Sequence, residues 1–371
     1  MITPKDELTA LLTLVRIEGL GPAKAKTLYT QVGNALEIFR SYKDLNDIIP
    51  GVTQCLIKTL NDSGSLFMAE RELSFIKEHH IRILTFEDAD YPARLRECED
   101  APLVLFSLGK IDPNTKHTIA VVGTRKATVY GKELATKLVK DIAVHIPDTL
   151  IISGLAYGID ITAHKAAMDS NIQTIGILAH GLDRIYPSAH RQTALQMLEN
   201  GGVLTEYMSG QMPLKYNFVR RNRIIAGMAD AVIVVESSLK GGSLITAEIA
   251  ESYSRACFAF PGSVGDVSSA GCNELIRSNR AGLIQSADDL IKDMGWETVC
   301  SKNPVQRELF YNLTETEQKI LKIISRTPKG AQLNTLVVEC NIPAGQMMSL
   351  LFELEMKEMI KSHPGCLYTT K

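Results

Sequence analysis

The chain has 371 residues, of which 45% are hydrophobic and 22% are charged, and its formal net charge is -2. This composition excludes an intrinsically disordered chain and is typical of a protein with two or three folded domains. It also excludes a protein that coats nucleic acid along its whole surface, because such proteins carry a large positive excess. Any nucleic-acid site must therefore be local.

The cysteines and the apolar runs exclude further classes. The seven cysteines form no C-x-x-C pair, so they indicate neither a zinc site nor a disulfide framework. No apolar run approaches the length of a membrane-spanning helix, and charged residues interrupt the first twenty positions. We therefore expect a cytoplasmic protein with no metal, no cofactor and no membrane partner.

Residues 1–66 contain short apolar periodic stretches broken by glycine, which predict a small all-helical domain. Gly19 and Gly21 lie between two expected helices, a pattern similar to a helix-hairpin-helix (SAM-like) module. Such a hairpin offers backbone amides to a phosphate, and Lys24 adds charge. A degenerate second copy is expected at 49–52. Tight interhelical turns without a ligand explain both segments equally well.

From Ile119 to Ala287, β-rich apolar runs alternate with longer amphipathic stretches, which indicates repeated βαβ units within an expected core domain, 67–298. The runs are nearly continuous, as expected of parallel strands covered by helices on both faces. A doubly wound, Rossmann-like and mainly parallel sheet is the predicted fold. The expected strands are 118–122, 149–153, 174–178, 203–206, 231–236, 256–260 and 283–285.

A stretch of weak propensity at 299–308 predicts a linker before a last domain, 309–371. Thr314 followed by Glu317 is typical of a helix N-terminus, and three helical stretches and a hairpin around Pro364 predict a winged helix. This domain has seven Lys and Arg against six Asp and Glu, so it lacks the basic face of a DNA-reading winged helix. Whether it binds DNA or protein stays open.

The first expected βα loop contains Gly123, Thr124, Arg125 and Lys126. It matches neither the three-glycine dinucleotide fingerprint nor a Walker loop. One glycine, hydroxyls and two cations at the carboxyl end of a strand instead predict a phosphate site. A solvated loop cation is an equally good explanation of Arg125 taken alone.

Two further loops of small residues lead into helices, Ser153-Gly154 and Gly242-Ser243, and should meet the first at one edge of the sheet. Asp160 and His164 follow the former, one helical turn apart. They have the residue types of an acid and base pair, but no nucleophile is spaced to join them. We therefore expect them to hold the loop by hydrogen bonds.

The strongest local signal lies between Glu206 and Asp230, where no acidic residue occurs. Cations there alternate with an aromatic ring and amides, so they can hold successive phosphates while the ring stacks on a base. A solvated helix face is the less favoured alternative, because the apolar residues that follow place some of these arginines near the sheet. We expect Asn217 to cap the helix. The predicted contacts are Lys215, Asn217, Phe218, Arg220, Arg221, Asn222 and Arg223.

Together these residues resemble the DNA-processing protein A (DprA, also called Smf) family, over most of 85–285. The resemblance is specific because many motifs occur in the same order. They are Asp90-Tyr91-Pro92, Ala101-Pro102, Val122-Gly123-Thr124-Arg125, Ser153-Gly154-Leu155-Ala156-Tyr157-Gly158-Ile159-Asp160, Ala163-His164, Tyr186-Pro187, Phe218, Arg220-Arg221-Asn222-Arg223-Ile224-Ile225-Ala226-Gly227, Gly242-Ser243-Leu244-Ile245-Thr246-Ala247 and Pro261-Gly262.

The resemblance implies an extended Rossmann-like core that binds single-stranded DNA, forms a homodimer and loads the RecA recombinase in natural transformation. It implies no catalytic residue. The strand-binding pocket of the family falls on Arg125, Lys215 and Phe218, with the other loops nearby. The role of His180, in the loop after the third expected strand, stays open.

A competing hypothesis is an enzyme that cleaves nucleoside monophosphates, because such enzymes use a similar sheet with glycine-rich loops. It requires a catalytic carboxylate beside the Gly242 loop. Glu248, five residues beyond Ser243, is the candidate.

Overall fold

The computed structural model describes residues 4–17, 19–40, 63–298, 314–327, 330–357, 359–363 and 367–370. The chain divides into two compact units, Met1–Val299 and Cys300–Lys371. The expected second hairpin at 49–52, the linker at 299–308 and the turn at Pro364 lie outside the described residues.

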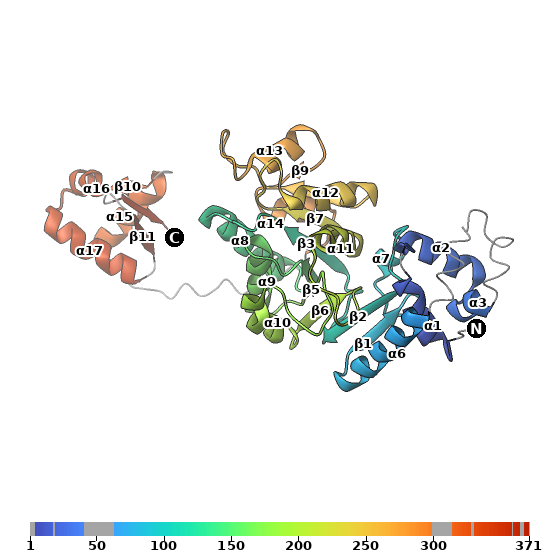
Figure 1. Ribbon diagram of the computed structural model, residues 1–371. Coiled ribbons are helices and arrows are strands. Elements are labelled where there is room, and N and C mark those ends of the chain that lie inside the picture. The colour runs from blue at the N-terminus through green and yellow to red at the C-terminus, as the bar shows by residue number, and fades with distance from the viewer. Residues whose placement is uncertain are drawn as a thin grey trace. The chain divides into compact units, whose positions relative to one another are not determined.

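In the described part of the first unit, a nine-stranded sheet has the order β1-β2-β6-β5-β4-β3-β7-β8-β9 (Figure 1). The seven neighbouring strands β6-β5-β4-β3-β7-β8-β9 pair in parallel, as predicted. Strands β1 and β2 were not predicted and extend the sheet by antiparallel pairing. The bounds are β1 Arg82–Thr85, β2 Val104–Gly109, β3 His117–Val122, β4 Thr149–Ser153, β5 Thr174–Ile177, β6 Gly201–Thr205, β7 Ala231–Val234, β8 Ala256–Ala259 and β9 Gly282–Leu283.

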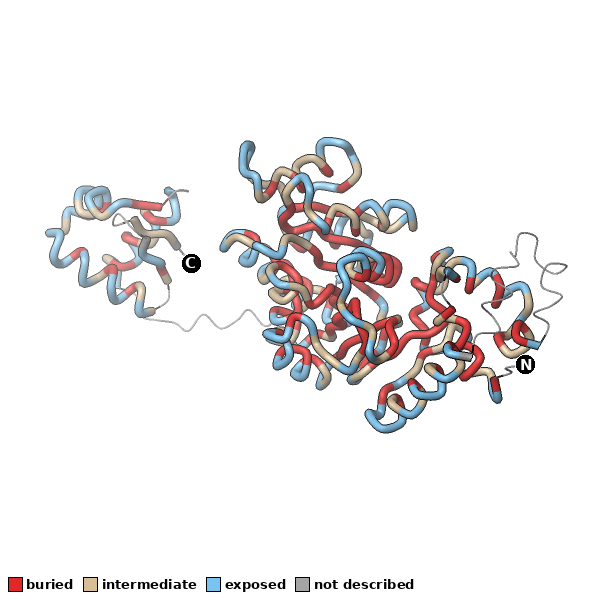
Figure 2. Tube along the Cα trace, in the orientation of Figure 1, coloured by how far each residue is buried: buried red, intermediate tan, exposed pale blue. Residues whose placement is uncertain are grey.

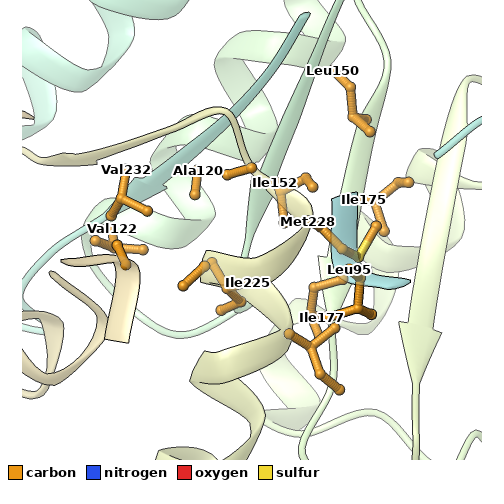
Figure 3. Packing of buried hydrophobic residues seen from close by; sticks show 14 of the residues in the cluster. Leu95, Ala120, Val122, Leu150, Ile152, Ile175, Ile177, Ile225, Met228 and Val232 are labelled. Carbon is orange, nitrogen blue, oxygen red and sulfur yellow. The ribbon is translucent and has the colours of Figure 1, made fainter. Parts of the chain in front are cut away.

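Helices cover both faces of this sheet, which explains why its strands are apolar at nearly every position. Ala120 and Val122 of β3 pack against α7, α11, α12 and α13, whereas Ile119 and Val121 pack against α8, α9 and α14. Figure 3 shows Ile225 of α11 in the first of these layers. The helices are α7 Ala93–Arg96, α8 Val129–His145, α9 Ile159–Asp169, α10 Arg191–Met197, α11 Lys215–Met228, α12 Gly242–Ser252, α13 Ala270–Arg277 and α14 Ala287–Asp293, with a short 3-10 turn Ser188–His190.

The N-terminal helices are α1 Glu7–Arg16, α2 Pro22–Val32, α3 Ala35–Arg40 and α6 Ser63–Glu78. They share one buried cluster with β2, so the predicted helical domain and the Rossmann-like core meet across a common apolar layer. Lys26 of α2 also links the helices to the core, because its Nζ donates to the carbonyls of Arg96 at 2.9 Å and Cys98 at 2.7 Å. The domain boundary near residue 66 stays a prediction.

The second unit has the predicted winged-helix elements in its described residues: α15 Glu315–Arg326, β10 Ala331–Gln332, α16 Leu333–Cys340, α17 Ala344–Met356, β11 Ile360–His363 and β12 Leu367–Thr370. Thr314 and Glu317 form the expected capping box at the start of α15. This unit has its own buried core (Figure 2). None of the helices that the structure describes is long and apolar enough to cross a bilayer.

Candidate nucleic-acid interface

The loops that follow β3, β4 and β7 meet the start of α11 around a pocket of about 490 Å³. Strand β3 lies between β4 and β7, and the chain reverses its direction of winding there. Open α/β sheets bind ligands at such a switch point. The predicted site residues that line the pocket are Gly123, Thr124, Arg125, Lys215, Phe218, Arg221, Asn222, Gly242 and Ser243.

A cation and two aromatic rings stand together at this pocket. The guanidinium carbon of Arg125 lies 5.1 Å from the ring centroid of Phe218. The ring of Tyr186 is 5.7 Å from that of Phe218, tilted by 56°, and Tyr186 is 46% exposed. Such a group can hold a phosphate and offer aromatic faces to unpaired bases. Tyr186 was not predicted as a site residue, although its motif supported the resemblance.

Backbone hydrogen bonds fix the loop after β3. The amide of Thr124 donates to the carbonyl of Glu236 at 2.7 Å, and its carbonyl accepts from Ile159 at 3.2 Å. Gly123 is required here, because a Cβ atom would lie 2.5 Å from the side chain of Ile159 and 2.9 Å from the Glu236 carbonyl. The rigid loop leaves the side chains of Arg125 and Lys126 exposed.

The buried guanidinium of Arg221 holds the loop after β4. Its Nη1 donates to the carbonyls of Gly154, at 2.8 Å, and Ile177. Asp160 accepts from the amides of Gly154 at 3.1 Å and Ala156 at 3.3 Å, which confirms the expected loop-holding role of this carboxylate. Burial lowers the pKa of Arg221 to about 10, while the charge of Asp160 raises it. Arg221 therefore supports the wall of the pocket rather than extending into solvent.

Two more residues predicted to contact DNA are buried, and their side chains donate hydrogen bonds to other parts of the protein. Arg223 is 5% exposed and donates to Glu206 and, at 2.6 Å, to the carbonyl of Asp100. Asn217 is 3% exposed and donates to the carbonyls of Ala179 and Met212. The expectation that Asn217 caps the helix was wrong, because α11 begins at Lys215 with Leu214 as its N-cap.

Arg220, also a predicted contact, is exposed on α11, lies outside the lining of this pocket and is 3.8 Å from Glu206. Of three further predicted residues, two are buried and one is exposed. Ser153 is buried and donates to the carbonyl of Val121 at 2.6 Å, and Ser243 is buried and donates to Ser237 at 2.8 Å. Gly242 is exposed at the first position of α12, where no side chain among the described residues caps the helix. Its first-turn amides can therefore serve an anion.

The histidines have structural partners. His164 is fully buried and bonds Thr174 through Nδ1 at 2.7 Å, and burial lowers its pKa to about 3. It is therefore neutral, and it bonds strand β5 instead of the loop after β4, so the expectation that His164 holds this loop was wrong. His180 accepts from the amide of Tyr186 at 3.2 Å, so its other nitrogen donates to the carbonyl of Gly181 at 2.9 Å. The sequence left the role of His180 open; in the structure, His180 holds the backbone of Tyr186 at the pocket.

The hairpin residues lie at the surface of the N-terminal helices. Gly19 has a φ of 80°, the left-handed region that glycine adopts without strain, and Gly21 is the N-cap of α2. The Lys24 side chain is exposed and free to contact a phosphate, whereas Lys26 is occupied by the backbone of the core.

The carboxylate that the enzyme hypothesis requires lies elsewhere. Glu248 is on α12 and pairs with Arg280 at 3.4 Å, and its side chain is 65% exposed. It is not among the described residues that line the pocket. No group of three or more His, Cys, Asp or Glu among the described residues is arranged to hold a metal.

Comparison with known proteins decides the family. Residues 82–295 match the family model of DNA recombination-mediator protein A, and residues 310–366 match the DprA winged helix domain. The chain belongs to the DprA family. A putative DNA processing protein DprA of Mycobacterium tuberculosis is 32% identical over 311 residues, which cover 80% of this chain and 79% of the relative. DprA of Bacillus subtilis is 38% identical over 225 residues, covering 60% and 75% respectively.

Two solved DprA structures match this chain. DprA of Streptococcus pneumoniae superimposes with a TM-score of 0.63 at 32% identity and covers 77% of this chain and 97% of its own. DprA of Helicobacter pylori, solved for its single-stranded-DNA-binding mode, gives a TM-score of 0.52 at 30% identity, with 58% and 96% covered. Family membership confirms the resemblance, and with it the DNA-processing class and the Rossmann-like core with a winged helix.

Proposed function

We propose that this protein binds single-stranded DNA in the pocket at the switch point of the sheet. The observation that carries the proposal is the arrangement of Arg125 over the ring of Phe218 beside Tyr186. A flexible strand can place a phosphate on the cation and splay a base onto a ring, whereas the paired bases of a duplex cannot reach either ring. The H. pylori relative, which binds single-stranded DNA, supports the same ligand.

In this proposal, the exposed cations and amides bind the phosphates of the strand, and the aromatic ring of Phe218 binds a base. Arg125, Lys126 and Lys215 are exposed cations and take backbone phosphates, and the first-turn amides at Gly242 take another. Phe218 stacks on a base of any identity. Because these cations are few, the interface is local, in agreement with the small net charge of the chain.

The buried residues have a positioning role in this proposal. Arg221 ties the β4 loop to the sheet, and Arg223 and Asn217 fix α11 against its neighbours. Ser153 and Gly154 belong to the same framework, and a Cβ atom on Gly154 would lie 2.5 Å from the guanidinium of Arg221. We therefore assign no direct DNA contact to these five residues.

We further propose that the protein is a binding protein without catalytic turnover, that it acts in the cytoplasm as a homodimer, and that it delivers the strand to a RecA-type recombinase. The family description as a recombination mediator supports the last step. Two observations support the absence of turnover. Glu248, the carboxylate named by the enzyme hypothesis, pairs with Arg280 and is not among the described residues that line the pocket. Asp160 does line the pocket, but its carboxylate accepts from the backbone amides of Gly154 and Ala156.

The test is an equilibrium titration of the full chain with single strands, duplexes of the same sequence and free mononucleotides at several salt concentrations. We expect single strands to bind best, with log affinity falling linearly against log salt concentration. Preferential binding of duplex, or release of free base from a nucleoside monophosphate that Glu248→Gln abolishes, would overturn the proposal.

A further inference from the structure

A third exposed aromatic ring stands next to the pocket, on the loop after β4. Tyr157 follows Ala156, which lines the pocket, and Tyr157 is 48% exposed. Its ring contacts that of His190, with centroids 4.7 Å apart and planes at 68°. Tyr186 and Phe218 contact one another and so form one aromatic group, whereas Tyr157 packs on a different partner. Tyr157 is therefore a separate aromatic surface beside the pocket.

The loop that carries Tyr157 packs directly on the loop that carries Arg125. The amide of Ile159 donates to the carbonyl of Thr124 at 3.2 Å. Gly158 has a φ of 78°, and a Cβ atom there would overlap the carbonyl oxygen of Thr124 and lie 2.8 Å from that of Arg125. Only glycine allows both this conformation and this close approach. The backbone next to Tyr157 is therefore held against the loop that presents Arg125 to a phosphate.

Buried groups also fix the position of the Tyr157 ring. His190, which packs on this ring, is 7% exposed, and its Nδ1 donates to the carbonyl of Leu155 at 2.8 Å. Leu155 is fully buried and has a φ of 54°, a left-handed conformation that is unfavourable for a bulky residue. Strained backbone of this kind is found where a site requires one fixed arrangement of side chains. A ring that is already held in place loses little conformational entropy when a base stacks on it.

We propose that Tyr157 is a second base-stacking platform, which takes the base next to the one on Phe218. Consecutive nucleotides share one phosphate, and Arg125 adjoins both platforms. Its guanidinium lies on the Phe218 ring, and its backbone lies against the loop of Tyr157. The site then binds a base, a phosphate and a base as one unit, with little dependence on base identity. The proposal rests on the proposed function, because it adds a contact to the same strand.

The test uses strands made of abasic units that contain either one thymine or two adjacent thymines, so that the number of bases available for stacking is fixed. Their affinities for the full chain are measured by fluorescence anisotropy. The wild type should bind the two-thymine strand about tenfold more tightly, because a second ring is then occupied. In Tyr157→Ala the two strands should bind nearly alike. Tyr157→Phe keeps the ring and should behave as the wild type does.

Two further measurements separate stacking from a purely structural role. Tyr157→Ala should leave the slope of log affinity against log salt unchanged for ordinary single strands, because stacking releases no counterions. Tyr130→Ala is the matched control, since Tyr130 is 53% exposed on α8 and is not among the described residues that line the pocket. This control should keep the preference for two thymines. Circular dichroism checks the fold of each variant.

Failure of this inference is distinct from failure of the proposed function. Equal binding of both strands by the wild type, or a preference for two thymines that survives in Tyr157→Ala, would overturn the second platform while leaving binding at Phe218 intact. A lower salt slope in Tyr157→Ala would also overturn it, because the residue would then only hold the Arg125 loop. Absence of single-strand binding by the wild type would instead overturn the proposed function itself.

Discussion

The contact between Arg125 and Phe218 gives a quantitative expectation for paired substitutions. Phe218→Ala removes a stacking surface, which typically stabilises binding by about 1–3 kcal/mol, so we expect a Kd roughly 30-fold weaker. It also removes the ring that lies 5.1 Å from the Arg125 guanidinium and holds it in place. That contact contributes about 0.5–1 kcal/mol at an exposed position. The two residues should therefore be energetically coupled.

The salt dependence separates their roles. Arg125→Ala should lower the slope of log affinity against log salt by about 0.7, the increment for one phosphate on a single strand. Phe218→Ala should leave the slope nearly unchanged, because stacking releases no counterions. The double variant should bind more weakly than either single variant. Its loss of binding free energy should, however, be about 0.5–1 kcal/mol smaller than the sum of the two single losses.

The assay is fluorescence anisotropy with a labelled single strand at several salt concentrations, with each fold checked by circular dichroism. Phe218→Leu keeps an apolar side chain without a ring and should resemble Phe218→Ala. Arg191→Ala, an exposed cation on α10 outside the pocket lining, is the control for charge and should bind as the wild type does. Strict additivity of the two losses, with no change of slope in Arg125→Ala, would refute a shared pocket.

Two further expectations concern the buried framework of the pocket, and a third concerns the C-terminal unit. Arg221→Met should reduce the free energy of unfolding by about 3–5 kcal/mol in a denaturant titration, because it leaves the buried Asp160 without a neighbouring cation. A reduction below about 1 kcal/mol would contradict the positioning role of Arg221. The folded pKa of His164 is about 3, below its ordinary value of 6.5, so the stability that it contributes is complete above pH 6.5 and is lost as pH falls toward 3. This loss should be about 2 kcal/mol at pH 5, and His164→Gln should remove that part of the pH profile; an identical profile in the variant would count against it. Deletion of residues 300–371, a separate compact unit, should change single-strand affinity less than about threefold by anisotropy, whereas a loss of nearly all binding would place the site in the winged helix.

The parallel strands could be predicted from the sequence because both of their faces are covered. Each strand from β3 to β8 therefore has an uninterrupted apolar run, and the predicted bounds agree with the structure to within a few residues. Strand β1 could not be predicted this way, since it is short, lies at the edge and buries only one of its four residues fully. The sharing of a core by the N-terminal helices and β2 depends on contacts between distant segments, which periodicity does not reveal.

The candidate site was predictable as a set of loops but not as a set of contacts. Glycines and cations after strands placed Arg125 at the pocket. The cationic stretch of α11, however, contains both exposed and buried arginines, and the partners of the buried ones come from other elements. Arg221 bonds the carbonyl of Ile177, and Arg223 bonds that of Asp100. Tyr186 was missed because only the fold brings its ring beside Phe218.

The most direct test of the central claim is to map where a bound strand touches the full chain. A single strand with photoreactive bases is cross-linked to the protein at low salt, and the modified peptides are identified by mass spectrometry. We expect cross-links on Phe218 and Tyr186, competed by unlabelled single strand and much less by duplex. Cross-links confined to α15–α17, or to the outer face of α8, would contradict binding at the switch point of the sheet.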